Sequence, residues 1–347
     1  MNFIRRFQHV DFNLLEKRAA SKNNAGLYEN GWFAETEETA WDAVREEQSE
    51  IVDAFGADEA VRRSLLLFRE FSEAQNDLAE IAGSRLPPLS PWEIQKKLGI
   101  DVLKMRNQPT GDCVGNGASR AAETLLLDLR AQKFEIEPRL VHPSYCYAGA
   151  RMLAGSRSGA GANVALAAKF MFENGVLFED TPGVKSYDND TKMSDRLGSR
   201  WDSTEMKELI QYAAPFRVTA IKLPSRDNMA AINLCLDAGA KIVGGFRRKF
   251  IAGSTRHGVK FGRLSGSWFH CVSILGRFSD PTPGYIWGNS HGNHYPGTCV
   301  LGTPAWALNL SPEDTASMCN GASLYALLFV QTGTNQSKPD WRPMPVV

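Results

Sequence analysis

The sequence lacks several features that mark common functional classes. Positive and negative side chains are balanced, with Lys+Arg and Asp+Glu at 39 each, so no net field draws the chain to nucleic acid or to an anionic membrane. No segment approaches the roughly 18 consecutive apolar residues that a membrane span requires. We therefore expect no nucleic-acid partner and no membrane span.

Paired cysteines and a secretion signal are also missing. The six cysteines include no CxxC pair, which argues against a zinc ribbon and against a compact disulfide framework. Residues 1–21 contain early arginines but no apolar run and no small-residue cleavage site. We expect free thiols, no metal or other cofactor, and a protein that is not classically secreted but lies in the cytoplasm or within a particle assembled there.

The N-terminal part of the chain is charged and favours helix. Residues 35–83 predict a helical hairpin, and Ser90-Pro91-Trp92-Glu93 is typical of a capping box with proline at the first helical position. A short helix should therefore run to Gly99. In the second half of the hairpin, apolar residues recur at mostly three- and four-residue steps and mark one helix face: Val61, Leu65, Phe68, Phe71, Leu78 and Ile81.

Strand-like segments dominate the C-terminal part. Because helices come first and strands later, the predicted fold class is α+β. We divide the chain into a helical extension over residues 1–95, a main domain over 96–332 and an irregular, proline-containing tail over 333–347. The predicted strands are residues 217–223, 240–246, 268–276, 284–289 and 322–331.

Cys113 lies between a glycine-containing turn and a segment of high helix propensity, SRAAETLLLDLRAQ. A cysteine that opens a helix lies in the field of unsatisfied amide N–H groups, which favours its thiolate. We expect the following helix to be central and buried. Asp112, just before the cysteine, is expected to cap this helix, although its negative charge would disfavour the thiolate.

A thiolate nucleophile needs an imidazole, a group that orients the imidazole, and a donor for the oxyanion. His270 lies in the strand-like run SWFHCVSILG, where a polar ring is unexpected among apolar neighbours. Asn289 follows the next strand and precedes a glycine turn. Gln108 precedes Cys113 closely enough to return its side-chain amide to the thiol.

These residues resemble, in type and order, the Gln, Cys, His and Asn-Ser-x-Gly elements of the papain-like cysteine peptidases, over about residues 97–332. The resemblance implies a helical lobe carrying the cysteine, an antiparallel barrel-like lobe carrying His and Asn, and an active site between them. It also implies roles: Cys113 attacks, His270 holds the thiolate as an ion pair and protonates the leaving amine, Asn289 orients the ring, and Gln108 donates to the oxyanion.

Several positions depart from that family's pattern. Val114 stands where the family has a tryptophan, and Thr110 where it has a disulfide cysteine, which is consistent with a reducing location. Gln108 is one residue closer to the nucleophile than is usual, and the separation of Cys113 from His270 exceeds the roughly 130–150 residues typical of the family. His291 replaces the tryptophan that shields the Asn–His hydrogen bond, which leaves this bond more hydrated or gives the site a second imidazole.

The other cysteines and His142 are expected to be structural. Cys271 should point to the opposite face of its strand from His270 and belong to the core. His291 and His294 have HxxH spacing, but no carboxylate at a matching spacing completes a metal site. The other residues of this group are His142, Cys146, Cys235, Cys299 and Cys319.

Three functions fit the sequence. The leading one is cysteine-dependent hydrolysis of a peptide or protein substrate by a Cys-His-Asn triad. The alternative is a structural or docking component of a large assembly such as a phage virion, because papain-like domains with helical extensions also resemble proteins encoded among phage structural genes. The third is another thiol-dependent amide hydrolase or transferase, such as one acting on cell-wall peptide.

The helical extension over residues 1–95 leaves two roles open. It blocks the cleft as a prosegment does, or it binds neighbouring subunits. Chain ends fray unless something holds them, so ordered ends would favour a chain packed inside an assembly.

Overall fold

The structure, a computed structural model, describes residues 32–55, 68–85, 89–134, 136–190, 192–292 and 300–331. Its helices and seven-stranded sheet confirm the predicted α+β class. The helices are α2 (Glu37–Phe55), α4 (Phe71–Ser84), α5 (Pro91–Leu98), α6 (Cys113–Ala131), α7 (Pro143–Leu153), α8 (Val164–Asn174), α9 (Met193–Ser199), α10 (Thr204–Ala213), α11 (Met229–Asp237) and α12 (Pro312–Cys319). The strands are β1 (Phe68–Glu70), β2 (Phe216–Lys222), β3 (Lys241–Arg256), β4 (Val259–Phe278), β5 (Gly284–Gly288), β6 (Ala307–Leu310) and β7 (Ser323–Gln331).

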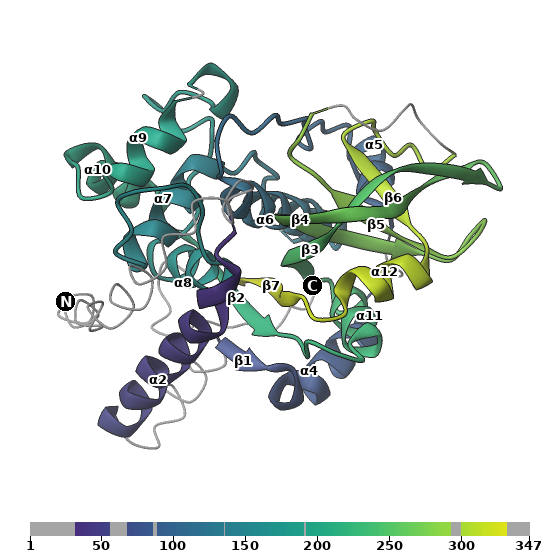
Figure 1. The fold of residues 1–347 in the computed structure, drawn as a ribbon, viewed down its shortest axis with the longest axis horizontal. Coiled ribbons are helices and arrows are strands. Elements are labelled where there is room, and N and C mark those ends of the chain that lie inside the picture. Colours follow the sequence, from purple (N-terminus) through teal and green to yellow (C-terminus); the bar gives the residue numbers. More distant parts are fainter. Residues whose placement is uncertain are drawn as a thin grey trace.

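The sheet has the strand order β1-β2-β7-β3-β4-β5-β6. Strand β1 runs parallel to β2, and the neighbouring pairs from β2 to β6 are antiparallel. The first part of β4 also pairs with β6, at Phe261 and Asn309, so β4, β5 and β6 curl toward a closed arrangement. Figure 1 shows α7 to α10 gathered on one side of α6, and the long strands β3 and β4 with the short strands β5 and β6 on the other.

Helix α6 lies between the helical half and the sheet and is buried over most of its length, as the sequence predicted. It packs against α7 and against β3 and β4. Gly117 permits the close approach, because a Cβ at this position would lie 2.8 Å from Cys271 Sγ and 3.2 Å from Val243 Cγ2. The helix that begins at Cys113 is therefore held tightly against the strand that carries His270.

Two core clusters lie on opposite faces of the sheet. Successive side chains of a strand point to opposite faces. Accordingly Val243 and Cys271 join the cluster with α6, α7 and α8, while Ile242 and Val272 join the one with α4, α11 and α12. A smaller cluster around Trp92 and Trp306 packs α5 onto this framework.

The predicted helix after Ser90 is confirmed. Ser90 Oγ accepts a hydrogen bond from Glu93 N at 3.2 Å, and Glu93 Oε2 accepts one from Ser90 N at 2.9 Å. The helix ends at Gly99, whose φ of 66° lies in the left-handed region that glycine favours.

The predicted hairpin over residues 35–83 is correct only in part. Helix α2 forms, but Phe68 lies in strand β1 rather than on a helix face, and the next helix in the described residues, α4, begins at Phe71. Phe68 is buried with its ring 6.3 Å from that of Trp41 and 5.6 Å from that of Phe172, and its backbone pairs with β2. Tertiary packing thus overrides the helical pattern here. Val61 and Leu65 lie outside the described residues.

The described part of the N-terminal extension belongs to the main body. Strand β1 joins the sheet, and Trp32 and Trp41 lie in the core cluster around α6. The boundary at residue 95 stays a prediction, and the tail 333–347 and both chain ends lie outside the described residues. Within the described ranges, no helix is both long and apolar enough to cross a bilayer.

Candidate active site

Cys113 is the first residue of α6 and has no exposed surface. The helix starts here because Asp112 O accepts the first helical hydrogen bond, from Asn116 N at 3.1 Å. The backbone N–H of Cys271 in β4 donates to Cys113 Sγ at 3.3 Å. The thiol therefore lies against the residue that follows His270.

His270, in β4, and Asn289, just past the end of β5, form a hydrogen-bonded pair. His270 Nε2 lies 2.9 Å from Asn289 Oδ1, which also accepts from Ser290 N at 2.9 Å. An amide oxygen only accepts, so Nε2 carries the hydrogen, and Nδ1 is the acceptor nitrogen of the neutral ring. Both residues are buried. The tautomer is thus set by Asn289.

The loop before Cys113 is joined to the chain after Asn289. Asn107 forms an antiparallel bridge with His291, Gln108 N donates to Ser290 O at 2.8 Å, and Gly292 N donates to Arg106 O at 2.9 Å. These main-chain bonds hold the loop before α6 against the chain that follows β5, where Asn289 lies.

Gln108 is engaged within this same loop. Its Nε2 donates to Thr110 O at 3.0 Å, and its Oε1 accepts from Ser290 Oγ at 2.6 Å. The side chain therefore links the loop before the cysteine to the residue after Asn289. Its role toward an oxyanion stays a prediction.

Asp112 does not cap α6 with its side chain, contrary to the sequence-based expectation. Its Oδ2 instead accepts from Ser194 Oγ at 2.6 Å and from Tyr187 OH at 2.9 Å. Its Oδ1 is buried and accepts no hydrogen bond from any residue in the described ranges. Burial therefore raises the pKa of this carboxyl to about 6, against the opposing effect of Ser194 and Tyr187.

Burial also dominates the protonation of Cys113. It raises the pKa of the thiol far above its ordinary value; the Cys271 amide lowers it, and the neighbouring Asp112 charge raises it further. The field of the helix N-terminus does not overcome this desolvation. In this buried arrangement the thiol is neutral.

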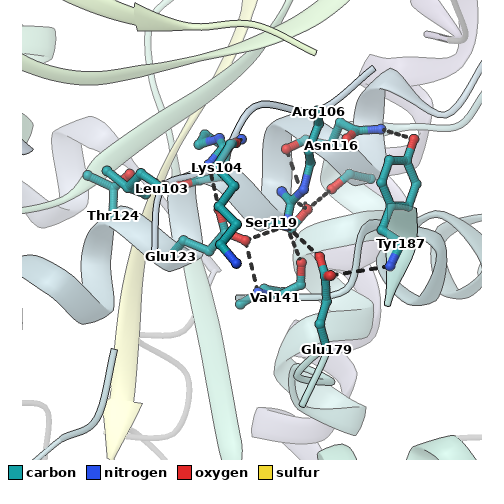
Figure 2. A network of polar contacts seen from close by, with 12 residues as sticks. Leu103, Lys104, Arg106, Asn116, Ser119, Glu123, Thr124, Val141, Glu179 and Tyr187 are labelled. Carbon is teal, nitrogen blue, oxygen red and sulfur yellow. Dashed lines mark hydrogen bonds and ion pairs between the residues drawn. The ribbon is translucent and has the colours of Figure 1, made fainter. Parts of the chain in front are cut away.

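A buried ionic network anchors the segment that leads to Cys113. Figure 2 shows Arg106 directed at Glu123 and Glu179, and its Nη2 also donates to Val141 O at 2.7 Å. Glu123 Oε1 in turn accepts from Val141 N at 2.9 Å. Arg120 pairs with Glu123 at 3.0 Å. Paired buried charges of this kind hold the loop and α6 in one geometry.

The network continues through Tyr187 to Asp112, the residue before Cys113. Glu179 Oε2 accepts from Tyr187 N at 3.2 Å, and Tyr187 OH bonds both Asn116 Nδ2, at 3.1 Å, and Asp112. Sequence reasoning missed this connection, since Glu179 and Tyr187 lie in a loop far along the chain. The only sign of this network in the sequence is the presence of charged residues, Arg120 and Glu123, within the mostly apolar α6 segment.

Cys271 is a core residue, as predicted. It is buried in the cluster around α6 and faces Gly117, on the opposite side of β4 from His270.

A small hollow lies next to Asn289. Its lining includes Cys271, Asn289 and Ser290, and neither Cys113 nor His270 lines it. Among the described residues, no cluster of three or more His, Cys, Asp or Glu side chains could hold a metal ion.

Three aromatic rings, two from β4 and one from the chain just after β5, pack together. The ring of His270 lies 4.5 Å from that of Trp268 and 4.1 Å from that of His291, centroid to centroid, and the two imidazoles are nearly parallel at 26°. The Trp268 and His291 rings meet edge to face at 5.8 Å. The sequence left two outcomes open for His291: a more hydrated Asn–His hydrogen bond or a second imidazole at the site. The structure places the second imidazole against His270.

No protein-family profile matches the sequence, and a search of curated proteins gave no match. Among solved structures, the cysteine protease xylellain from Xylella fastidiosa is 16% identical with a TM-score of 0.47, over 72% of this chain and 88% of that one. Procathepsin B S9 from Trypanosoma congolense is 12% identical with a TM-score of 0.43, over 73% and 80%. Procathepsin L 3 of the Tenebrio molitor larval midgut is 12% identical with a TM-score of 0.44, over 94% and 99%. Values this low assign the chain to no family, so its candidate function rests on its own arrangement of Cys113, His270 and Asn289.

Proposed function

We propose that this protein is a cysteine-dependent peptidase that uses Cys113 as nucleophile. The observation that carries the proposal is the His270–Asn289 hydrogen bond of 2.9 Å, located where the adjacent Cys271 amide contacts the thiol of a helix-opening cysteine. A buried thiol alone is a common core feature, but here the thiol contacts the residue that follows an oriented imidazole, and nucleophilic catalysis requires both groups.

The chemistry follows from the tautomer. His270 Nδ1 accepts the Cys113 proton, and the thiolate attacks the substrate carbonyl carbon, which forms a C–S bond and moves an electron pair to oxygen. The C–N bond then breaks as His270 returns the proton to the leaving amine. Water, with His270 as base, hydrolyses the thioester and restores the thiol. Asn289 holds the ring in position through both steps.

The oxyanion requires hydrogen-bond donors at the start of α6. The Cys113 amide lies at the helix N-terminus, where N–H groups have no partner within the helix. The Gln108 amide carries two hydrogens, and Thr110 O accepts one of them. We assign the second hydrogen to the oxyanion, so that Gln108 serves both the loop and the reaction.

A second candidate is a structural or docking role, within an assembly such as a virion, with little or no catalysis. The burial of Cys113 and the raised pKa of its thiol favour it, because a substrate reaches the sulfur only if the covering residues move. Under this proposal the N-terminal helices bind neighbouring subunits.

Hydrolysis of a denatured, fluorescently labelled protein separates the two candidates. We expect turnover by the wild-type chain, and a loss of at least about 10³-fold in Cys113→Ser and in His270→Ala, because each removes part of one catalytic unit. Cys235→Ser is the matched control: Cys235 is equally buried but lies in α11, in the core cluster on the other face of the sheet. Absence of turnover in the wild-type chain, or turnover that survives in Cys113→Ser, would favour the docking role.

A further inference from the structure

Positive charge is unevenly distributed along the chain. The chain as a whole is neutral, yet the segment from Ala238 to Ser279 contains eight lysines and arginines and no aspartate or glutamate. Strands β3 and β4 make up most of this segment, and Figure 1 shows them on the side of α6 opposite α7 to α10. The β3–β4 hairpin therefore concentrates positive charge, and the rest of the chain carries an equal excess of acidic side chains.

Three of these basic side chains share one face of the hairpin. Side chains alternate along a strand, so Arg247 and Lys249 lie on the same face of β3 as Val243, which belongs to the core cluster around α6. Arg263 in β4 is paired with Ile251, the next residue along that face. All three basic side chains are exposed. We call Arg247, Lys249 and Arg263 the basic face.

The charges of the basic face are available to a ligand. No acidic side chain in the described ranges forms an ion pair with Arg247, Lys249 or Arg263. The Arg247 guanidinium lies 5.6 Å from the centroid of the Phe269 ring, which leaves its charge without a counterion. Exposed cations of this kind attract anionic groups from solution.

The basic face adjoins the candidate active site. Gly245 in β3 is paired with Cys271, whose amide contacts the Cys113 thiol. Two residues of a strand span roughly 7 Å, so Arg247 lies about that far along β3 from this contact, and Lys249 lies about twice as far. A polypeptide chain that reaches the thiol can therefore also reach the basic face.

We propose that the basic face is a docking site for an acidic segment of the polypeptide substrate. In an extended peptide, every second side chain points to the same side, at the same spacing of roughly 7 Å that separates Arg247 from Lys249. Carboxylates at alternate positions can thus form ion pairs with both cations, and Arg263 offers a third on β4. This inference rests on the proposed function, because it takes the bound polypeptide to be the substrate of the Cys113 site.

An acidic peptide fits this charge distribution better than a nucleic acid does. A nucleic acid carries negative charge along its whole length, and beyond the hairpin it would meet a molecule whose other side chains are acidic in excess. Single-stranded bases also bind by stacking on aromatic rings, and none of the exposed residues between 247 and 267 is Phe, Tyr or Trp. A short acidic segment needs only the basic face.

Binding of a fluorescent octaglutamate peptide to full-length Cys113→Ser tests the docking site without any contribution from turnover. In fluorescence anisotropy at low ionic strength, the triple variant Arg247→Gln/Lys249→Gln/Arg263→Gln should bind at least about tenfold more weakly, because it loses three ion pairs. Lys249→Glu alone should weaken binding at least about threefold, since it places a like charge in the row. Raising the salt concentration should weaken binding to the unsubstituted basic face, because exposed charges are screened.

The matched control removes the same amount of charge elsewhere. It replaces three exposed lysines of α5 and α10 by glutamine: Lys96, Lys97 and Lys207. We expect this control to change the octaglutamate affinity less than about threefold. Equal affinities in the triple variant and the control would overturn the proposal, as would tighter binding of oligodeoxythymidine than of octaglutamate. Self-association of the triple variant with an unchanged octaglutamate affinity would also overturn it and would assign these charges to the protection of an exposed hairpin.

Peptidase kinetics separate a failure of this inference from a failure of the proposed function. We expect the wild-type chain to cleave a peptide that carries a glutamate run with a kcat/KM at least about tenfold above that of the matched glutamine peptide, and the triple variant to lose this preference. Cleavage of both peptides with equal kcat/KM would overturn the docking role and leave the peptidase standing. Octaglutamate binding that depends on the basic face, in a chain without peptidase activity, would reject the proposed function and leave an acidic-peptide site.

Discussion

At the scale of single residues, the protonation of the site is decided by burial rather than by sequence position. The sequence suggested that a cysteine opening a helix would form a thiolate, but the thiol is fully buried and its pKa is raised. The sequence also suggested a capping Asp112, yet this side chain binds Tyr187 and Ser194, which come from a separate part of the chain. Desolvation depends on what covers a group, and the local sequence does not contain that information.

Asp112 gives a prediction about stability. Burial raises its pKa from 3.8 to about 6, so the folded state binds this proton more tightly than the unfolded state. The stabilising contribution is fully present below the unfolded value of 3.8 and is lost as the pH rises through about 6. A shift of this size corresponds to roughly 3 kcal/mol.

Asp112→Asn removes this titration. Between about pH 4 and pH 7.5, the free energy of unfolding of the wild-type chain should fall by up to about 3 kcal/mol more than that of Asp112→Asn, as measured by urea denaturation at both pH values. Asp202→Asn is the control, since Asp202 is exposed and paired with Arg157. Parallel pH profiles for wild type and Asp112→Asn would show that the buried carboxyl does not titrate in this range.

At the scale of elements, the sequence predicted the strands better than their partners. The predicted runs correspond to β2, β3, β4, β5 and β7, because β-branched and aromatic residues between turn signals mark a strand locally. The sequence did not predict β1, a three-residue strand within a segment of helical periodicity, or β6, a four-residue strand. The order of the strands depends on long-range pairing, which no local pattern contains.

In the candidate site, too, the sequence predicted the residue types but not the contacts between them. Cys113, His270 and Asn289 were singled out because their types and order are visible in the sequence; the structure bonds His270 to Asn289 and places the Cys113 thiol against the Cys271 amide, and their catalytic roles stay predictions. The stacking of His291 on His270 requires the β4–β5 register, and the bonds of Gln108 to Thr110 and Ser290 require the folded loop. Residue types are therefore predictable here, whereas the contacts that tune them come from tertiary structure.

The contact of α6 with β4 gives a prediction at this scale. Gly117→Ala should destabilise the fold by about 1–2 kcal/mol, because overpacking against Cys271 and Val243 exceeds the roughly 1 kcal/mol that alanine contributes within a helix. Gly83→Ala is the matched control: Gly83 lies in α4 with no atom within 4 Å of an added Cβ, and this change should stabilise by about 0.5–1 kcal/mol. Chemical denaturation measures both.

A double substitution tests whether the Cys271 sulfur causes the destabilisation expected in Gly117→Ala. Adding Cys271→Ala to Gly117→Ala removes the sulfur that meets the new Cβ, so the two changes should be less destabilising together than the sum of their separate effects. Strict additivity would place the cost of Gly117→Ala somewhere other than this contact.

At the scale of the whole molecule, residues 32–37 connect the helical half to the sheet. Trp32 forms a bridge with Ala162, and its ring fills the space over Gly245 in β3, where a Cβ would come within 1.9 Å of the ring. Glu37, fully buried, accepts from Val164 N at 2.9 Å and Ala165 N at 2.7 Å at the start of α8, and from Trp32 Nε1 at 3.0 Å. This segment is therefore hydrogen-bonded to the helical half and packed against the sheet.

Trp32→Ala tests whether the N-terminal region folds as part of one unit with the remainder. We expect it to lower the free energy of unfolding by about 3–5 kcal/mol, because it removes a large buried ring, and to leave a single unfolding transition. Trp201→Ala is the control, since the Trp201 ring is only partly buried, beside Arg157, and its loss should cost less than that of Trp32. Circular dichroism and calorimetry report the transition. If the region before residue 96 is instead a separable prosegment or docking arm, Trp32→Ala will leave the main transition at its wild-type midpoint, because the remaining core does not then depend on a ring that the extension supplies.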